Sequence, residues 1–184
     1  MQPQALSESY RATAGPAKVR PPVEKDAAIV HALIENSPEL DTNSCYTYLL
    51  QAWHYADTCA LAEIAGVPAG YVSAFIPPRQ PDTLFIWQLV VAPAARGSGV
   101  ARAMVLDLLQ RGSCSGVRFI ESTVARGNGE SERFFHKLAD LLQAELSISE
   151  RLPAVLFRPD AHASERLFRI GPVRHPHDNN HPGA

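Results

Sequence analysis

The sequence predicts an α/β domain built on a mixed, mostly antiparallel sheet of about six to seven strands with helices on both faces. Segments with a helical spacing of apolar residues alternate with short segments rich in β-branched and aromatic residues. Three of the strand-like segments follow one another with only turns between them, a pattern typical of an antiparallel meander. The chain of 184 residues, 46% of them hydrophobic, is long enough and apolar enough to bury one core.

Two helices are expected ahead of these three strands. The first covers residues 24–36 and ends before Pro38, because proline cannot continue a helix. The second covers residues 44–55, with Asn43 or Ser44 as its N-cap. Apolar side chains recur on one face of each helix, namely Ile29, Val30, Leu33 and Ile34 in the first and Tyr48, Leu49 and Ala52 in the second.

The three strands of the meander are expected over residues 58–64, 69–76 and 83–92. The break at residues 65–68 is short enough for a hairpin. Prolines at positions 77, 78 and 81 separate the second strand from the third, so an antiparallel order is expected.

After the meander, helix and strand alternate. The expected elements are a helix over 98–111, a strand over 117–123, a helix over 128–143 and a strand over 145–150. The first of these helices is closed by Gly112 and would bury Ala101, Met104, Val105 and Leu108. A last strand falls near residues 154–157 or 167–170, and the pattern leaves both open.

The folded domain is expected to span residues 19–171, between an N-terminal tail of residues 1–18 and a C-terminal tail of residues 172–184. Seven of the fifteen prolines lie in the first 22 and last 13 residues, a composition typical of poorly ordered ends. The C-terminal tail carries His175, His177 and His181. No metal site is expected there, because a flexible tail lacks the neighbouring groups that orient metal ligands.

The charges exclude one class of function and divide the chain. A net charge of −2 argues against a protein whose main task is to neutralise a nucleic-acid backbone. Residues 23–63 hold seven acidic residues and one basic residue, whereas residues 96–118 hold four arginines and one aspartate. The first segment is suited to attract a cation and the second an anion.

The cysteines and the apolar runs indicate a cytoplasmic protein. Cys45, Cys59 and Cys114 form no C-x-x-C pair, so neither a disulfide framework nor a zinc site is indicated, and three buried free thiols are expected. No apolar run approaches the ~18 residues of a membrane span, and residues 1–16 lack the apolar stretch of a signal peptide. No contact with a membrane is therefore expected.

The strongest local signal is the segment VAPAARGSGVA, residues 91–101, between an expected strand and an expected helix. Gly97 and Gly99 let the backbone approach a ligand closely, and the first N–H groups of a helix have no internal partners. A pyrophosphate fits such a site. The spacing matches neither the Walker motif nor the dinucleotide-binding motif, and a glycine-rich helix start without a ligand is the alternative.

Two motifs resemble the GNAT acetyltransferase superfamily. Arg96, Gly99 and Ala101 match its R-x-x-G-x-A signature, and residues 128–135 (NGESERFF) resemble its N-x-x-A-x-x-L-Y segment. The resemblance spans roughly residues 19–157 and implies the GNAT fold and acetyl-CoA as co-substrate, with direct transfer to an amine, no acyl-enzyme and no metal.

The resemblance also implies a set of cofactor-binding residues. Backbone groups of two β-strand residues would bind the pantetheine arm, and the N–H groups of the following turn would hold the pyrophosphate. The residues concerned are Leu89, Val91, Arg96, Gly97, Ser98, Gly99, Val100, Ala101, Asn128 and Ser131. For Arg96, a solvated position beside the helix start is the alternative.

The sequence departs from the superfamily at both positions that usually carry proton transfer. Phe135 stands where many members have a tyrosine that reprotonates the thiolate, and phenylalanine donates no proton. Trp87 and Gln88 stand where a glutamate base is common, and a neutral amide is not a base. The catalytic acid and base are therefore unassigned, and an ordered water relay is one option.

Several segments resemble a narrower family, the L-2,4-diaminobutyrate acetyltransferases of ectoine biosynthesis. The matching segments are residues 40–50, 54–58, 80–88 and 162–172. The resemblance implies acetylation of the γ-amino group of the diamino acid by a homodimeric enzyme. An acceptor with two amines and one carboxylate is net cationic at neutral pH and favours an acidic pocket.

Six residues are carried over as acceptor-binding candidates: Asp41, Tyr46, Trp87, Asp160, His162 and Glu165. Ala163 stands where the family often has a glutamate, so whether Asp160 or Glu165 supplies the carboxylate stays open. The alternative roles are a helix cap for Asp41 and core packing for Trp87. Two readings compete with this function, namely a GNAT enzyme for a polyamine, an amino sugar or a protein terminus, and a non-catalytic acyl-CoA-binding module.

Three further candidates follow from position alone. Glu121 is an acid near the reacting centre if its side chain points inward, but strand alternation does not fix its side. His54 and Tyr55 end a helix and are expected to pack.

Overall fold

The computed structural model describes residues 15–38, 40–158 and 162–174. The chain divides into two compact units. The first unit comprises Met1–Phe75 and Trp87–Cys114, and the second comprises Ile76–Ile86 and Ser115–Ala184. Among the described residues, seven strands form a sheet in the order β1-β2-β3-β4-β5-β7-β6. β4 pairs with β5 in parallel, whereas β1–β2, β2–β3, β5–β7 and β6–β7 are antiparallel, which confirms a mixed, mostly antiparallel sheet.

The first unit opens with the short strand β1 (Lys18–Arg20), which the sequence did not predict. The 3-10 helix η1 (Glu24–Asp26) and the helix α2 (Ala27–Glu35) follow. Arg20 donates to Asp26 at 2.6 Å and to Glu63 of the neighbouring strand at 2.8 Å, so one guanidinium ties η1 to the sheet. The Arg20 guanidinium holds the pKa of Asp26 below its usual value.

Helix α3 (Cys45–His54) begins after Ser44, one of the two predicted N-caps, and leads into the 3-10 helix η2 (Ala56–Thr58). Two residues of the expected apolar helix faces are not covered, since Ile29 is 41% exposed and Leu49 is 38% exposed. The reason is that each helix buries a narrower stripe than the sequence pattern suggested. The buried residues of the two helices are Ala27, Val30 and Ile34 in α2 and Tyr48, Gln51 and Ala52 in α3.

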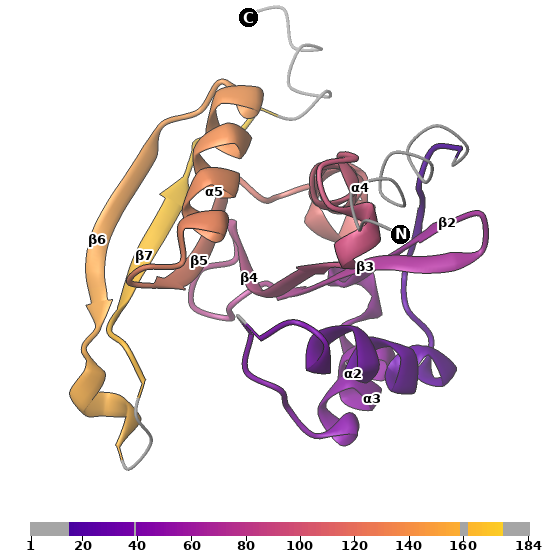
Figure 1. Cartoon of the computed structure of the whole chain (residues 1–184). Coiled ribbons are helices and arrows are strands. Elements are labelled where there is room, and N and C mark those ends of the chain that lie inside the picture. Colours follow the sequence, from indigo (N-terminus) through magenta and orange to yellow (C-terminus); the bar gives the residue numbers. More distant parts are fainter. Residues whose placement is uncertain (1–14, 39, 159–161, 175–184) are drawn as a thin grey trace, which may run out of the picture. The chain divides into compact units, whose positions relative to one another are not determined.

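Strands β2 (Ala60–Ile64) and β3 (Val67–Phe75) form the expected hairpin. Its turn is shorter than predicted and consists of Ala65 and Gly66, both with positive φ (51° and 78°). A two-residue turn with positive φ at both positions matches the twist of antiparallel strands, so Pro68 falls inside β3 instead of in the break. In Figure 1, α2 and α3 lie on one face of β2 and β3, and α4 lies on the other.

Strand β4 (Thr83–Val91) leads through the 3-10 helix η3 (Pro93–Ala95) to α4 (Val100–Gln110). The close packing of β3 against the last part of β4 and α4 depends on Gly70. A Cβ there would lie 2.8 Å from the Val90 carbonyl oxygen and 3.0 Å from side-chain atoms of Val100 and Met104. The 3-10 helix η4 (Gly112–Cys114) follows α4. Between them, Arg111 fixes η2 by donating to the Ala56, Asp57 and Cys59 carbonyl oxygens at 3.1, 3.2 and 2.7 Å.

The second unit contains β5 (Phe119–Ala125), α5 (Gly129–Leu142), β6 (Leu146–Leu152), the 3-10 helix η5 (Ala154–Phe157) and β7 (Glu165–Ile170). Of the two segments left open for the last strand, 167–170 lies in β7 and 154–157 is helical. Phe135 of α5 packs against Phe168 of β7, with ring centroids 5.8 Å apart. β6 lies at one edge of the sheet, and most of its side chains are exposed.

Several expectations concern the ends of the chain and the thiols. Val173 is 4% exposed and its N–H donates to the Arg118 carbonyl oxygen at 2.7 Å, although the sequence assigned it to the tail. The predicted limits of the folded domain otherwise stay a prediction, and His175, His177 and His181 lie outside the described residues.

Cys59 and Cys114 are buried as expected, but Cys45 is exposed at the start of α3. No helix within the described ranges is long and apolar enough to cross a membrane.

Candidate functional site

The turn before α4 has the backbone geometry that the sequence predicted for an anion cradle. Gly97 and Gly99 have φ values of 75° and 87°, a region that other L-residues rarely adopt. The helix therefore begins at Val100 and not at residue 98, as the sequence had suggested. Gly99 is its N-cap and has no side chain with which to cap the first N–H groups.

The space in front of this turn is open. A Cβ added to Gly99 would meet nothing within 4 Å, and Gly97, Ser98 and Gly99 are exposed. Ser98 does not offer its hydroxyl to a ligand in this structure, because Oγ donates to the Ala95 carbonyl oxygen at 2.6 Å and stabilises the turn. The N–H groups at the start of α4 and the positive end of the helix dipole are thus presented to an anion.

The other cofactor-binding candidates lie on either side of this turn in the sequence. Leu89 and Val91 are half-buried on β4 and alternate with the buried Gln88 and Val90, as expected for a strand. Arg96 is half-buried and ends η3.

Asn128 and Ser131 belong to the second unit, where they have a structural role that the sequence did not assign. Asn128 is the N-cap of α5, and its Oδ1 accepts a hydrogen bond from the Ser131 N–H at 3.1 Å. This bond satisfies one of the free donors at the helix start and fixes the position of the Asn128 amide.

Three acceptor-binding candidates lie in the first unit. Trp87 is 47% exposed, which excludes the alternative that it only fills the core. Tyr46, in the first turn of α3, is 66% exposed, and Asp41 is also exposed. Asp41 is not the cap of α3, because Ser44 occupies that position. The two alternative roles weighed against Asp41 and Trp87 therefore do not apply.

A partly buried hydrogen bond brings the Asp41 backbone next to β4. The Nε2 group of Gln88, the neighbour of Trp87, donates to the Asp41 carbonyl oxygen at 2.8 Å. The two residues are 47 positions apart, and nothing in the local sequence pattern signals this contact.

Two further acceptor-binding candidates, His162 and Glu165, lie in the second unit. The imidazole of His162 stacks on Phe157 with ring centroids 4.1 Å apart, and its Nε2 lies 3.5 Å from a carboxylate oxygen of Glu165. The structure thus places His162 and Glu165 together. Asp160 lies outside the described residues, so the choice between Asp160 and Glu165 stays open.

The positions expected to carry proton transfer hold neither an acid nor a base. Phe135 is 4% exposed and is packed among Phe134 and Phe168. Gln88 is buried and neutral. Glu121 is buried as well, and its carboxylate forms an ion pair with Arg169. No group of three or more potential metal ligands occurs within residues 15–38, 40–158 and 162–174.

Two further candidates differ from expectation. His54 and Tyr55 are exposed, not packed, and the His54 ring stacks on the exposed Trp53 with centroids 4.4 Å apart. The His54 ring is therefore packed against a neighbouring ring at the surface and is not buried in the core, as the sequence had suggested.

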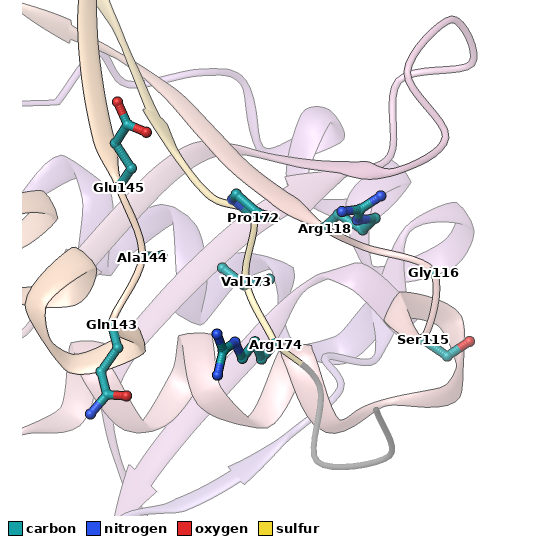
Figure 2. A pocket seen from close by; sticks show the side chains of 9 residues that line it. All are labelled: Ser115, Gly116, Arg118, Gln143, Ala144, Glu145, Pro172, Val173 and Arg174. Atoms are coloured by element: carbon teal, nitrogen blue, oxygen red, sulfur yellow. The ribbon is translucent and has the colours of Figure 1, made fainter. Parts of the chain in front are cut away.

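A separate pocket of about 640 Å³ lies in the second unit (Figure 2). Residues from three segments line it: 115–118, 143–145 and 172–174. It contains none of the predicted site residues. Figure 2 shows its two arginines, Arg118 and Arg174, extending in different directions, so they do not converge on one ligand group.

Comparison with known proteins identifies the family. Residues 27–139 match the model of the acetyltransferase (GNAT) family. The chain is 40% identical over 155 residues to an L-2,4-diaminobutyric acid acetyltransferase of Shouchella clausii, covering 84% of this chain and 86% of that protein. It is 42% identical over 159 residues to the enzyme of the same name from Bordetella parapertussis, covering 86% of each. The chain belongs to the diaminobutyrate acetyltransferases of the GNAT family.

Solved structures agree with this assignment. The diaminobutyrate acetyltransferase EctA from Paenibacillus lautus, in complex with L-2,4-diaminobutyric acid and coenzyme A, superposes with a TM-score of 0.83 at 38% identity. The match covers 87% of this chain and 97% of that one. Ard1 from Thermoplasma volcanium has a TM-score of 0.70 at 19% identity, over 86% of this chain and 99% of that one, and shares the fold. This diaminobutyrate acetyltransferase therefore has the GNAT fold expected from its two motifs.

Proposed function

We propose that the protein transfers the acetyl group of acetyl-CoA to the γ-amino group of L-2,4-diaminobutyrate, giving N4-acetyl-L-2,4-diaminobutyrate for ectoine biosynthesis. The observation that carries the proposal is the uncapped start of α4 behind two glycines with positive φ, in a chain that belongs to this family. Such a helix start binds the pyrophosphate of a coenzyme A ester with backbone groups alone.

The residues present fit acetyl-CoA as co-substrate. The N–H groups of Gly97 and of residues 99–101 would hold the pyrophosphate, since the Ser98 N–H already donates to the Ala95 carbonyl oxygen at 3.3 Å. The open space at Gly99 would let a phosphate reach them. Backbone groups of Leu89 and Val91 bind the pantetheine arm, and Asn128 and Ser131 add contacts at the start of α5. When bound, acetyl-CoA supplies an activated thioester, which a neutral amine attacks directly.

The acceptor is bound through charge and aromatic surface. The exposed Asp41 carboxylate attracts a cationic amino acid, and Tyr46 and Trp87 offer exposed ring faces for the alkyl chain and the amines. In the second unit, His162 and Glu165 form a polar pair, and either Glu165 or Asp160 is proposed as a further carboxylate for the acceptor. No nucleophilic side chain is needed, because holding amine and thioester together lowers the barrier to direct transfer.

Because Phe135 and Gln88 cannot transfer protons, the catalytic acid and base stay unassigned. A relay of ordered water is one option, which would take the proton lost by the amine and return one to the departing coenzyme A thiolate. A non-catalytic acyl-CoA-binding module is the second candidate, and these two residues are the observations that favour it.

Turnover assays separate the candidates. The protein is mixed with acetyl-CoA and diaminobutyrate, spermidine, glucosamine or a short peptide, and the release of free thiol is followed. We expect the highest kcat/KM for diaminobutyrate, with acetylation at the γ-nitrogen shown by NMR of the product. Preference for another amine refutes the proposed acceptor, and coenzyme A binding without turnover of any amine supports the module.

We also propose a cytoplasmic homodimer with no nucleic-acid or membrane partner. The support is the family resemblance together with the charge of −2. Light scattering during size-exclusion chromatography should give about twice the 20.0 kDa chain mass.

A further inference from the structure

Gln88 is a buried residue whose amide makes an incomplete set of hydrogen bonds. It is 5% exposed, and its backbone N–H donates a hydrogen bond to Ser73 Oγ at 3.2 Å. Its Nε2 donates to the Asp41 carbonyl oxygen at 2.8 Å, whereas its Oε1 is buried and accepts no hydrogen bond from any described residue. Because a carbonyl oxygen only accepts, the contact with Asp41 fixes which end of the amide is the nitrogen.

This arrangement stabilises the fold less than an apolar side chain would. Burying an amide oxygen without a donor costs free energy, and methionine has nearly the same volume without that oxygen. The packing of β4 therefore does not explain a glutamine at this position. The hydrogen bond to the Asp41 backbone is what the structure offers as the reason for a glutamine at position 88.

The segment that Gln88 holds is fixed at a second point. The Asn43 N–H donates to the hydroxyl of Tyr48 at 3.2 Å, and Tyr48 is 1% exposed. Two buried side chains, one from β4 and one from α3, thus hold the backbone on either side of residue 42. The Asp41 side chain itself is at the surface.

We propose that Gln88 is a positioning residue for the acceptor and that Tyr48 is its second anchor. Gln88 fixes the Asp41 backbone and thereby the direction of the Asp41 carboxylate toward a cationic acceptor. This inference rests on the proposed role of Asp41 in binding diaminobutyrate. Gln88 takes no part in proton transfer, because a neutral amide neither gives nor takes a proton at neutral pH.

The test is the substitution Gln88→Met in the full chain. We expect the KM for diaminobutyrate to rise at least tenfold and the KM for acetyl-CoA to stay within twofold of the original. The midpoint of thermal unfolding should stay unchanged or rise, because the buried unpaired oxygen is lost. A role in the fold alone would give the opposite pattern, a lower midpoint with both KM values unchanged.

Two further variants keep the test sharp. Tyr48→Phe removes the bond to Asn43 and should also raise the KM for diaminobutyrate, with faster hydrogen exchange of the Asn43 amide in the free protein. Tyr71→Phe is the matched control, because it removes a buried bond of the same unit, from Tyr71 to Gln51 Oε1 at 3.0 Å, that does not involve the Asp41 segment. It should lower the unfolding midpoint and leave both KM values unchanged.

An acceptor KM that changes less than twofold in Gln88→Met overturns the proposal, as does an equal rise in both KM values. A fall in the unfolding midpoint as large as that of Tyr71→Phe also overturns it. Failure of the proposed function is detected separately, in the unsubstituted protein, as a preference for another amine. In that case, Gln88→Met should raise the KM for that other amine.

Discussion

Glu121 on β5 and Arg169 on β7 form an ion pair in which the carboxylate is buried and the guanidinium lies over the ring of Phe119, 3.8 Å from its centroid. The two strands are paired in register at these residues. The pair gives Glu121 a structural role, although its position on the sheet had made it a candidate acid for catalysis.

Arg169→Met should therefore destabilise the protein more than Glu121→Gln. The arginine variant leaves a buried carboxylate without its cation, whereas the glutamine variant leaves only a partly exposed arginine. We expect a loss of about 2 kcal/mol in unfolding free energy for Arg169→Met, less than for a fully buried pair because Arg169 is partly exposed. Urea unfolding of both variants measures the difference, and a kcat of Glu121→Gln reduced a hundredfold would contradict the structural role.

Asp26 should make the first unit sensitive to acid. Arg20 lowers the pKa of Asp26 in the folded protein. The ionised carboxylate therefore stabilises the folded state at pH values above the ordinary aspartate pKa of about 4. This stabilisation is lost as the pH falls through the lower pKa of the folded state. Asp26→Asn should lower the unfolding midpoint at pH 7 and flatten its decline between pH 5 and pH 2. Thermal unfolding over this range is the measurement, and parallel curves for the two proteins would refute the linkage.

Gly99→Ala should weaken acetyl-CoA binding through backbone strain alone. Its φ of 87° costs an alanine about 1 kcal/mol, while the added Cβ meets no neighbour. We expect a severalfold rise in the KM for acetyl-CoA and little change in the KM for the acceptor. Gly112→Ala is the matched control, since Gly112 also has open space around it but no positive φ, and it should leave both constants unchanged.

Gly70→Ala should destabilise the first unit by overpacking. The added Cβ would lie 2.8 Å from the Val90 carbonyl oxygen, a backbone atom that cannot move without disturbing β4. A loss of about 1–3 kcal/mol is expected, which for a chain of this size lowers the unfolding midpoint by about 2–12 °C. An unchanged midpoint in differential scanning calorimetry would show that β3, β4 and α4 pack less closely than described.

Asp41→Asn should raise the KM for diaminobutyrate at least tenfold and leave the KM for acetyl-CoA within twofold. The substitution keeps the size of the side chain and removes the charge that attracts a cationic acceptor. Glu35→Gln, which removes one exposed negative charge from α2 of the same unit, controls for the general field. Equal effects of Asp41→Asn on both substrates would remove Asp41 from the acceptor site.

Periodicity and glycine placement were enough to predict most of the fold. Within the described residues, six of the seven strands, the last as one of two alternatives, and all four α-helices were expected, because each presents a repeated apolar face or a turn that only certain residues favour. The three-residue β1 is too short to show a period, and the start of α4 depends on two φ angles that the sequence does not give.

The geometry of the candidate site could be predicted only where its residues are contiguous in the sequence. The turn around Gly97 and Gly99 is contiguous, so its backbone geometry followed from residue type. The bond from Gln88 to Asp41 and the pair of Glu121 with Arg169 join positions 47 and 48 apart, and no pattern of neighbouring residues encodes them. For the same reason, the sequence did not predict that Cys45, Ile29 and Leu49 are exposed. The packing partners of a helix decide which of its apolar residues are covered.

The unequal burial of the three thiols offers a way to observe directly the segment that carries Asp41 and Tyr46, the proposed acceptor-binding residues. Burial raises the pKa of Cys59 and Cys114, so both react slowly with thiol reagents, whereas Cys45 is exposed. Cys45 follows Ser44 and precedes Tyr46. A maleimide fluorophore should thus label Cys45 without any engineered cysteine, and we expect its emission to change on addition of diaminobutyrate, because Tyr46 is proposed to bind the acceptor.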